Sequence, residues 1–202
     1  MHSIAISQPV SAGEIAARSV SDEMLLQSIA DGETAAMHVL YARHNLRVYR
    51  FVLRMVRNPT TAEDIVSHVF LDVWHNAGQF QGRSQVSTWL LSIARFKALT
   101  ALRQRQHEDL DQDAVYGIAD PAESPEAALD RNRTSAILRA CIAKLSPAHR
   151  EIIDLVYYHE KSVEEAGVII GIPQATVKTR MFYARKHLGT LLKDAGVAHL
   201  AA

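Results

Sequence analysis

Two stretches of the sequence carry several basic side chains and no acidic ones, a pattern that suits contact with a polyanion. Residues 83–105 contain four arginines and one lysine, and residues 173–187 contain two arginines and two lysines. Clustered Lys and Arg side chains neutralise phosphates and supply much of the affinity of nucleic-acid interfaces. The formal net charge of the 202-residue chain is zero, so only its local distribution is informative. We expect two separate contacts with nucleic acid.

The residue types that perform catalysis or bind metals are present, but their spacing does not support either role. The chain has ten histidines and one cysteine, Cys141, and these do not cluster at the spacing of metal ligands. It also lacks a phosphate-binding Gly-rich loop, a nucleophile elbow and paired carboxylates with a plausible site. We expect no catalytic residue, no metal, no cofactor and no enzymatic activity.

The charge distribution divides the chain into two basic bodies joined by an acidic linker. Residues 106–130 contain eight acidic side chains, no basic one, two prolines and one glycine, a composition typical of a flexible connection. The flanking bodies, residues 21–105 and 131–195, have balances of +3 and +5. Residues 1–20 and 196–202 are expected to be a flexible extension and a C-terminal tail.

Composition also bears on the compartment. A single cysteine cannot form an internal disulfide, which favours a reducing environment. No apolar run approaches the roughly 18 residues of a membrane-spanning helix, and the N-terminus lacks the pattern of a secretory signal. We therefore expect a soluble, cytoplasmic protein without membrane insertion.

Apolar residues in the first body recur three and four positions apart, which predicts helices throughout. The first helix is expected to be capped by Ser21 or Asp22 and to stop near Gly32. A long second helix should end at Asn58-Pro59. The third should be capped by Thr60 or Thr61, with Glu63 and Asp64 in its first turn and Trp74 in the core. The fourth should start at Ser84 or Ser87 and end in the basic residues 103–105.

The second body contains the sharpest local signal, a helix-turn-helix. Helices are expected at 137–145 and from Ser146-Pro147 onward. Ser162-Val163-Glu164-Glu165 forms a capping box, and Gly171 provides a left-handed turn. A last helix from Pro173 to about Leu192 should bury Val177 and turn its polar side chains outward. The sequence thus predicts an all-α protein of two small helical domains.

Motifs in both bodies resemble the bacterial sigma-70 family in its short, extracytoplasmic-function (ECF) form. In the first body they are Ala62-Glu63-Asp64-Ile65-Val66, Phe70-Leu71-Asp72-Val73-Trp74, Phe80-Gln81-Gly82-Arg83-Ser84, Ser87-Thr88-Trp89-Leu90 and Ile93-Ala94-Arg95, which are similar to domain two. In the second they are Leu145-Ser146-Pro147, Arg150-Glu151-Ile152-Ile153, the capping box, residues 171–180 and Ala184-Arg185-Lys186, which are similar to domain four.

The resemblance implies an initiation factor that works as a subunit of RNA polymerase, with the β′ and β subunits of the core enzyme and promoter DNA as partners. Many members are held inactive by an anti-sigma factor, which the resemblance also makes an expected partner. The implied core-polymerase contacts are Glu63, Asp64, His68 and Asp72. The implied residues for melting the minus-ten element are Phe80, Arg83, Ser84, Trp89, Arg95, Phe96, Lys97 and Arg103. Those for reading the minus-thirty-five element are Gln174, Thr176, Lys178, Thr179, Arg180, Tyr183 and Arg185.

The chain departs from the family pattern at several positions. Phe96 and Thr100 stand where many members have Asn and Asp, and Ser67-His68 replaces Gln-Glu on the core-binding helix. Ala166-Gly167 replaces Ile-Ala in the first helix of the helix-turn-helix. The glycine permits close helix approach and costs about 1 kcal/mol of helix propensity.

Two other functions remain open at this point. A sigma-like decoy could sequester an anti-sigma factor without reading promoters, but it would not need two acid-free basic surfaces. A stand-alone helix-turn-helix regulator would account for the second body and leave the first unexplained.

Overall fold

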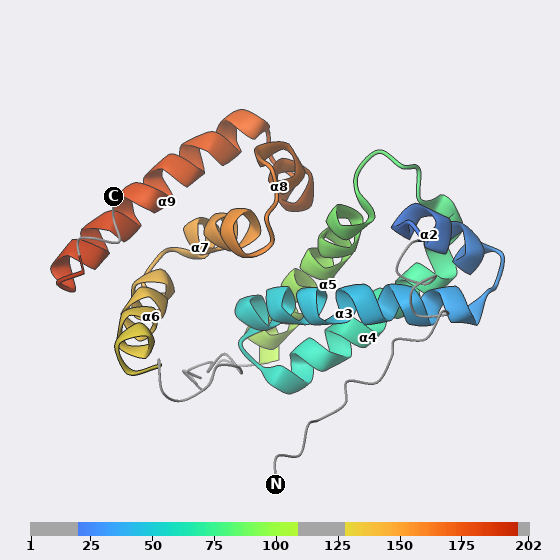
Figure 1. Ribbon diagram of the computed structural model, residues 1–202, viewed down its shortest axis with the longest axis horizontal. Helices are drawn as coiled ribbons and strands as arrows, with labels where there is room; N and C mark the ends of the chain where they lie inside the picture. The colour runs from blue at the N-terminus through green and yellow to red at the C-terminus, as the bar shows by residue number, and fades with distance from the viewer. Residues whose placement is uncertain (1–19, 109–127, 198–202) are drawn as a thin grey trace, which may run out of the picture.

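The computed structural model describes residues 20–108 and 128–197, and within these ranges the chain is helical without strands. The helices form two units that lie side by side (Figure 1). The N-terminal unit contains α2 (Asp22–Ala30), α3 (Thr34–Val56), α4 (Pro59–Asn76), the short 3₁₀ helix η1 (Ala77–Gln79) and α5 (Val86–Glu108). The C-terminal unit contains α6 (Ala128–Ala143), α7 (Pro147–Ile153), the π-helical turn η2 (Asp154–Tyr158), α8 (Val163–Ile170) and α9 (Gln174–Asp194).

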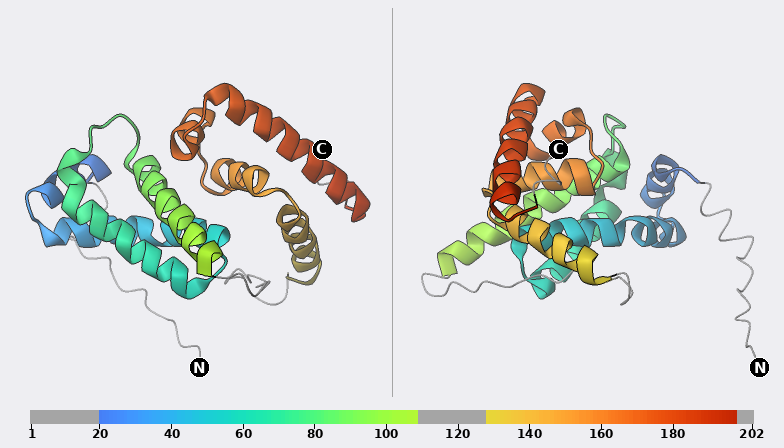
Figure 2. Two further views of the ribbon diagram at one scale, coloured as in Figure 1. Left: turned by 180° about the vertical axis from the view of Figure 1, so that it is seen from behind. Right: turned by 60° about the vertical axis from the view of Figure 1, so that its left-hand side comes forward.

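Helix α3 is the centre of the N-terminal unit, because α2, α4 and α5 all pack against it. Its residues Leu40, Phe51 and Val52 are inaccessible to solvent, as are Val69 of α4 and Leu90 of α5. The buried residues of α3 recur three or four positions apart from Ala36 to Val56, so burial of their apolar surface stabilises the helix and its packing together. The two further views in Figure 2 show α4 and α5 crossing α3 obliquely.

The start of α2 agrees with the sequence, whereas the start of α4 does not. The Ser21 hydroxyl accepts a hydrogen bond from the Met24 N–H, as an N-cap should. The prediction that Thr60 or Thr61 caps α4 is wrong, because Asn58 Oδ1 accepts from the Thr61 N–H at 2.9 Å and Pro59 is the first helical residue. Asparagine is a strong N-cap, and proline is pre-organised for the first position. The earlier start moves Glu63 and Asp64 out of the first turn.

Helix α5 begins between the two serines that the sequence suggested. The Gln85 carbonyl accepts hydrogen bonds from the N–H groups of Thr88 and Trp89, so the helix starts at Val86. Ser87 cannot cap it, because that residue is already helical and its hydroxyl accepts a hydrogen bond from Lys161 of the other unit. The helix continues to Glu108, three residues past the predicted boundary. The expected linker therefore overlaps both α5 and α6, and residues 109–127 lie outside the described part of the chain.

The C-terminal unit contains the predicted helix-turn-helix in α8 and α9. Ser162 and Glu165 form the reciprocal hydrogen bonds of a capping box at the start of α8. Gly171 ends that helix with a φ of 74°, in the left-handed region. Pro173 is the N-cap of α9 and Gln174 its first residue, one position later than expected. Helix α6 begins nine residues before the predicted start at Ile137.

Gly167 of α8 lies where the two helices of the motif meet. A Cβ atom added there would be 2.9 Å from the carbonyl oxygen of Ile172 and 3.7 Å from Cγ2 of Val177. The first distance is too short for a real contact, and a backbone atom cannot move aside easily. The close approach expected from a glycine at this position is therefore present.

We expect Gly167→Ala to lower the free energy of unfolding by about 1–3 kcal/mol, because the strain of overpacking exceeds the roughly 1 kcal/mol gained in helix propensity. Urea unfolding followed by circular dichroism measures the effect. Gly78→Ala is the matched control, since a Cβ there meets only the Ala30 side chain at an ordinary 3.6 Å. Equal or greater stability of Gly167→Ala would show that the helices separate at no cost.

The two units touch along α5 and α8. Their buried apolar residues form one contiguous cluster that includes Leu90, Leu91 and Ala94 of α5, and Ala166 and Ile169 of α8. A smaller separate cluster, Cys141, Leu192 and Val197, joins α6 to the end of α9. The two helical domains expected from the sequence are thus present, and in this structure they are packed against each other.

Candidate nucleic-acid and protein interfaces

Helix α9 presents a polar and basic face to solvent. Three of its buried side chains, Val177, Met181 and Ala184, lie three or four residues apart and pack on the rest of the C-terminal unit. The side chains between them therefore point away from the unit. Gln174, Lys178, Thr179, Tyr183 and Arg185 are exposed, and Thr176 and Arg180 are partly exposed. All seven residues predicted to read the minus-thirty-five element lie on this helix and are at least partly accessible to solvent.

Helix α4 presents a second exposed face, on the N-terminal unit. Glu63, Asp64 and His68 are exposed, whereas Ile65 and Val69 are buried against α3 and α5. The exposed face of α4 is acidic and that of α9 is basic. The first therefore suits a basic partner surface and the second suits nucleic acid.

Asp72 differs from the other three residues predicted to bind core polymerase. Its Oδ2 atom is 2.7 Å from Nζ of Lys97 on α5. The pair brings together one residue expected to bind protein and one expected to bind DNA. Because both are only partly exposed, their first role in this structure is to join α4 to α5.

The residues predicted to melt the minus-ten element lie in the loop after η1 and along α5. Phe80 and Trp89 are partly buried against the core, with ring centroids 5.3 Å apart. Phe96 is 71% exposed, so it offers a free stacking face where Phe80 and Trp89 do not. Arg83 and Arg103 are exposed and Ser84 is partly exposed.

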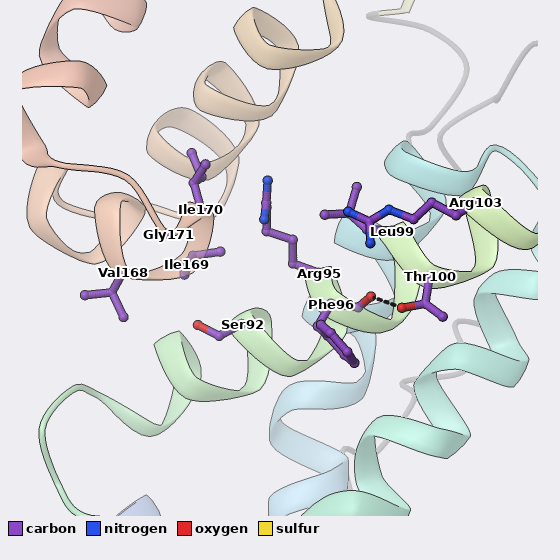
Figure 3. A pocket seen from close by; sticks show the side chains of 10 residues that line it. All are labelled: Ser92, Arg95, Phe96, Leu99, Thr100, Arg103, Val168, Ile169, Ile170 and Gly171. Carbon is purple, nitrogen blue, oxygen red and sulfur yellow. Dashed lines mark hydrogen bonds between the residues drawn. The ribbon is translucent and has the colours of Figure 1, made fainter.

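Arg95 is held by the other unit. Its Nε atom donates to Oε1 of Glu151 on α7 at 2.7 Å, and Nη2 lies 3.3 Å from Oε2, a bidentate pair. The side chain is 20% exposed. It borders a cleft of about 330 Å³ between α5 and the end of α8 (Figure 3). The lining from α5 is Ser92, Arg95, Phe96, Leu99, Thr100 and Arg103, and the lining from α8 and its turn is Val168, Ile169, Ile170 and Gly171.

A second polar cluster joins the start of α5 to the start of α8. Lys161 is nearly inaccessible, and its Nζ atom donates to Oγ of Ser87 at 2.7 Å, Oγ1 of Thr88 at 3.0 Å and Oε1 of Glu165 at 2.9 Å. The Thr88 hydroxyl donates to the same Glu165 oxygen at 2.6 Å. Each polar group is thereby paired, as burial requires.

Partial burial disfavours the charged form of Glu165, but its hydrogen bonds outweigh that effect. The donors are the Thr88 hydroxyl, the Ser162 N–H and Lys161, whose positive charge also favours the carboxylate. Together they lower the pKa of Glu165 from 4.5 to about 2. The carboxylate is therefore ionised, and the cluster intact, at neutral pH.

This shift predicts a pH dependence of stability. Because the folded-state pKa is the lower one, the contribution of Glu165 is fully present above about pH 4.5 and is lost as the pH falls toward 2. The difference in free energy of unfolding between the wild type and Glu165→Gln should be constant from pH 7 to 5 and shrink below that. Urea titrations at each pH measure it, with Glu164→Gln, an exposed neighbour, as the control. A constant difference down to pH 2.5 would contradict the assignment.

Sequence reasoning missed the residues that join the units: Arg54, Glu151, Asp154 and Lys161. Glu151 pairs with Arg95, Lys161 with Ser87, and Arg54 with Asp154. The two residues of each pair are 56 to 100 positions apart in the sequence, and no periodic pattern marks them.

The described residues show two further negative findings. Within 20–108 and 128–197, no group of three or more His, Cys, Asp or Glu side chains could hold a metal ion. In the same part of the chain, no helix combines the length and apolar character needed to cross a membrane.

Comparison with known proteins agrees with this architecture. Residues 40–118 match the family model described as Sigma-70 region 2, and residues 135–188 match Sigma-70, region 4. RNA polymerase sigma factor CarQ of Myxococcus xanthus is 31% identical over 172 residues, covering 84% of this chain and 96% of that protein. The chain belongs to the sigma-70 family, in its ECF group. ECF RNA polymerase sigma factor SigL of Mycobacterium tuberculosis is 29% identical, with 83% and 95% covered.

Solved structures of sigma factors share the fold. CnrH in complex with the cytosolic domain of CnrY gives a TM-score of 0.62 at 25% identity, covering 86% of this chain and 97% of that one. RpoE of Bartonella quintana in complex with the anti-sigma factor NepR gives 0.63 at 27% identity, covering 76% and 94%. This ECF sigma factor is accordingly a promoter-directing, non-enzymatic initiation factor whose two helical units are sigma domains two and four.

Proposed function

We propose a division of labour in which domain two docks on core RNA polymerase and melts the minus-ten element, while domain four reads the minus-thirty-five element. The observation that supports this most directly is the outward face of α9, where all seven predicted residues are accessible just after the Gly171 turn. We take domain two as residues 21–105 and domain four as 131–195, with 106–130 between them.

For domain four, α9 has the features of a recognition helix. In helix-turn-helix proteins the N-terminal residues of the second helix contact base edges in the major groove. Gln174, Lys178 and Thr179 lie in the first two turns of α9 and are exposed, so they suit hydrogen bonds to bases or phosphates. Arg185 lies farther along the helix, where it suits the phosphate backbone.

For domain two, the acidic face of α4 suits a basic partner surface on the β′ subunit. Exposed Phe96 suits stacking on an unpaired base, and exposed Arg83 and Arg103 suit the displaced strand. Unstacking of duplex DNA costs about 1–2 kcal/mol per step, which base capture by such residues helps to offset. Phe80 and Trp89 support this surface mainly by packing together.

We further propose that an anti-sigma factor binds this chain and that the protein acts in the cytoplasm, where it meets the polymerase. The support for the first point is that CnrH and RpoE, which share the fold, were solved as complexes with CnrY and with the anti-sigma factor NepR.

Run-off transcription tests the proposal. The purified chain is mixed with core RNA polymerase and a library of promoter fragments, and transcripts are mapped at their 5′ ends. New start sites preceded by two shared elements support the proposal. Tight, specific DNA binding without core enzyme would favour a stand-alone regulator, and capture of an anti-sigma factor without any transcript would favour a decoy.

A further inference from the structure

Two exposed histidines lie on the acidic face of α4. His68 and His75 are separated by about two helical turns, so both project from the same side of the helix as Asp64 and Leu71. All four side chains are exposed, and Leu71 is 50% accessible. Asp64, His68, Leu71 and His75 therefore form one continuous row along α4, which we call the histidine row.

The charge of the histidine row depends on pH. Histidine is the side chain that ordinarily gains a proton between pH 8 and pH 5, whereas exposed carboxylates stay ionised throughout that range. Beside the row, Glu63 is exposed, and neither it nor Asp64 has a basic partner among the described residues. With both histidines neutral this face is negative, and with both protonated its charges balance.

The neighbouring elements offer no described partner to either histidine. Helices α2, α3 and α5 and the short η1 pack against α4, and η1 has no titratable side chain. Lys97 of α5 is held by Asp72, and the ring of Tyr41 on α3 lies edge-on to an aromatic ring of α4. The carboxylate of Asp22 on α2 is paired with two basic side chains of α3. Solvent and the charges of α4 itself therefore surround the histidines.

In the free protein, α4 stabilises a positive charge on both histidines. Asp64 lies four residues before His68, and a carboxylate on the N-terminal side of a cation at this spacing is favourable. His75 lies in the last turn of α4, where the helix dipole favours a cation. A basic partner surface docked on the row has the opposite effect, because like charges across an interface repel. Docking and protonation therefore oppose each other, and by linkage each weakens the other by the same factor.

We infer that His68 and His75 make docking of this sigma factor on core RNA polymerase depend on pH, with tight docking when they are neutral and weaker docking when they are protonated. The inference rests on the proposed docking of α4 on a basic partner surface. It gives a role to His68, which stands where many family members have glutamate, and it adds His75 to the docking residues. A glutamate keeps its charge over this pH range, so the histidine makes the face respond to protons.

Two paired variants fix the charge of the row. His68→Gln with His75→Gln, the glutamine variant, is neutral at every pH, and His68→Lys with His75→Lys, the lysine variant, is positive at every pH used. Both positions are exposed, and glutamine and lysine are good helix formers, so neither variant disturbs the core. His187→Gln is the control, because His187 is an exposed histidine on α9 in the other domain.

The affinity of each labelled full chain for core RNA polymerase is measured by fluorescence anisotropy at pH 8 and at pH 6, at constant ionic strength and without DNA. Both values lie above the range below about pH 4.5 in which the contribution of Glu165 is lost. Titratable groups of the polymerase affect every variant alike. The quantity compared is therefore the ratio of the dissociation constants at pH 6 and pH 8.

We expect this ratio to be about five- to tenfold greater for the wild type and for His187→Gln than for the glutamine variant. Each exposed like-charge contact lowers affinity by about threefold to fivefold, and the row has two such positions. The lysine variant should bind about tenfold more weakly than the wild type at pH 8. Its ratio should equal that of the glutamine variant, because neither changes charge.

Equal ratios for the wild type and the glutamine variant would overturn the inference, because the histidines would not then be the groups that take up protons. Binding of the lysine variant at pH 8 as tight as that of the wild type would also overturn it, because positive charge on the row would not then oppose docking. If the wild type does not bind core enzyme at either pH, the proposed function fails and the inference fails with it.

Discussion

Asp64→Arg is expected to weaken binding of this sigma factor to core RNA polymerase by about 30- to 700-fold. Asp64 is exposed on α4 in the face formed with Glu63 and His68. Reversal of its charge replaces an attraction to a basic partner surface by a repulsion, and like charges across an interface cost several kcal/mol, here about 2–4 kcal/mol. Since Asp64 makes no described contact with domain four, DNA binding by α9 should not change.

Titration of labelled sigma factor with core enzyme, followed by fluorescence anisotropy, measures this effect. Asp31→Arg is the matched control, because Asp31 is an exposed acid at the C-terminal end of α2, where a positive charge is compatible with the helix dipole. If Asp64→Arg and Asp31→Arg bind core enzyme equally well, the polymerase docks elsewhere. A greater effect at 50 mM than at 300 mM salt would identify the loss as electrostatic.

Lys178→Ala is expected to weaken binding to the minus-thirty-five element by about 5- to 150-fold and to leave core binding unchanged. Lys178 is exposed in the second turn of α9. It follows Val177, which is buried and packs α9 against the core. A side-chain contact to a base edge contributes about 1–3 kcal/mol of discrimination. Removal of a solvent-exposed amine at this position should not disturb the fold.

Electrophoretic mobility shifts with holoenzyme and matched promoters, one carrying a scrambled minus-thirty-five element, measure the loss. A contact to bases lowers affinity only for the intact element, whereas a contact to phosphate lowers both affinities and reduces the salt slope by about one. Lys193→Ala is the control, because Lys193 is an exposed basic residue at the far end of the same helix. Equal effects of the two substitutions would remove α9 from promoter reading, and loss of core association by Lys178→Ala would contradict the division of labour.

Local chemistry in the sequence determined the elements of this protein. The capping box from Ser162 to Glu165, the left-handed Gly171 and the apolar spacing of α9 are set within a few residues of one another, so they were predictable from sequence and appear in the structure. The errors at helix starts have equally local causes. Asn58 is a stronger N-cap candidate than the threonines after Pro59, and two serines three positions apart, Ser84 and Ser87, left the start of α5 open between them.

Tertiary structure alone decided how the candidate surfaces are used. Lys97 and Asp72 were expected to serve different partners, yet they pair with each other, and Arg95 is held by Glu151, 56 residues away. Such pairs form because folding brings distant charges into a partly desolvated space, where each needs a partner. No periodicity encodes that requirement. The sequence by itself therefore established the helices, the two domains and their family, and the packing of α5 on α8 established which of their charges remain available.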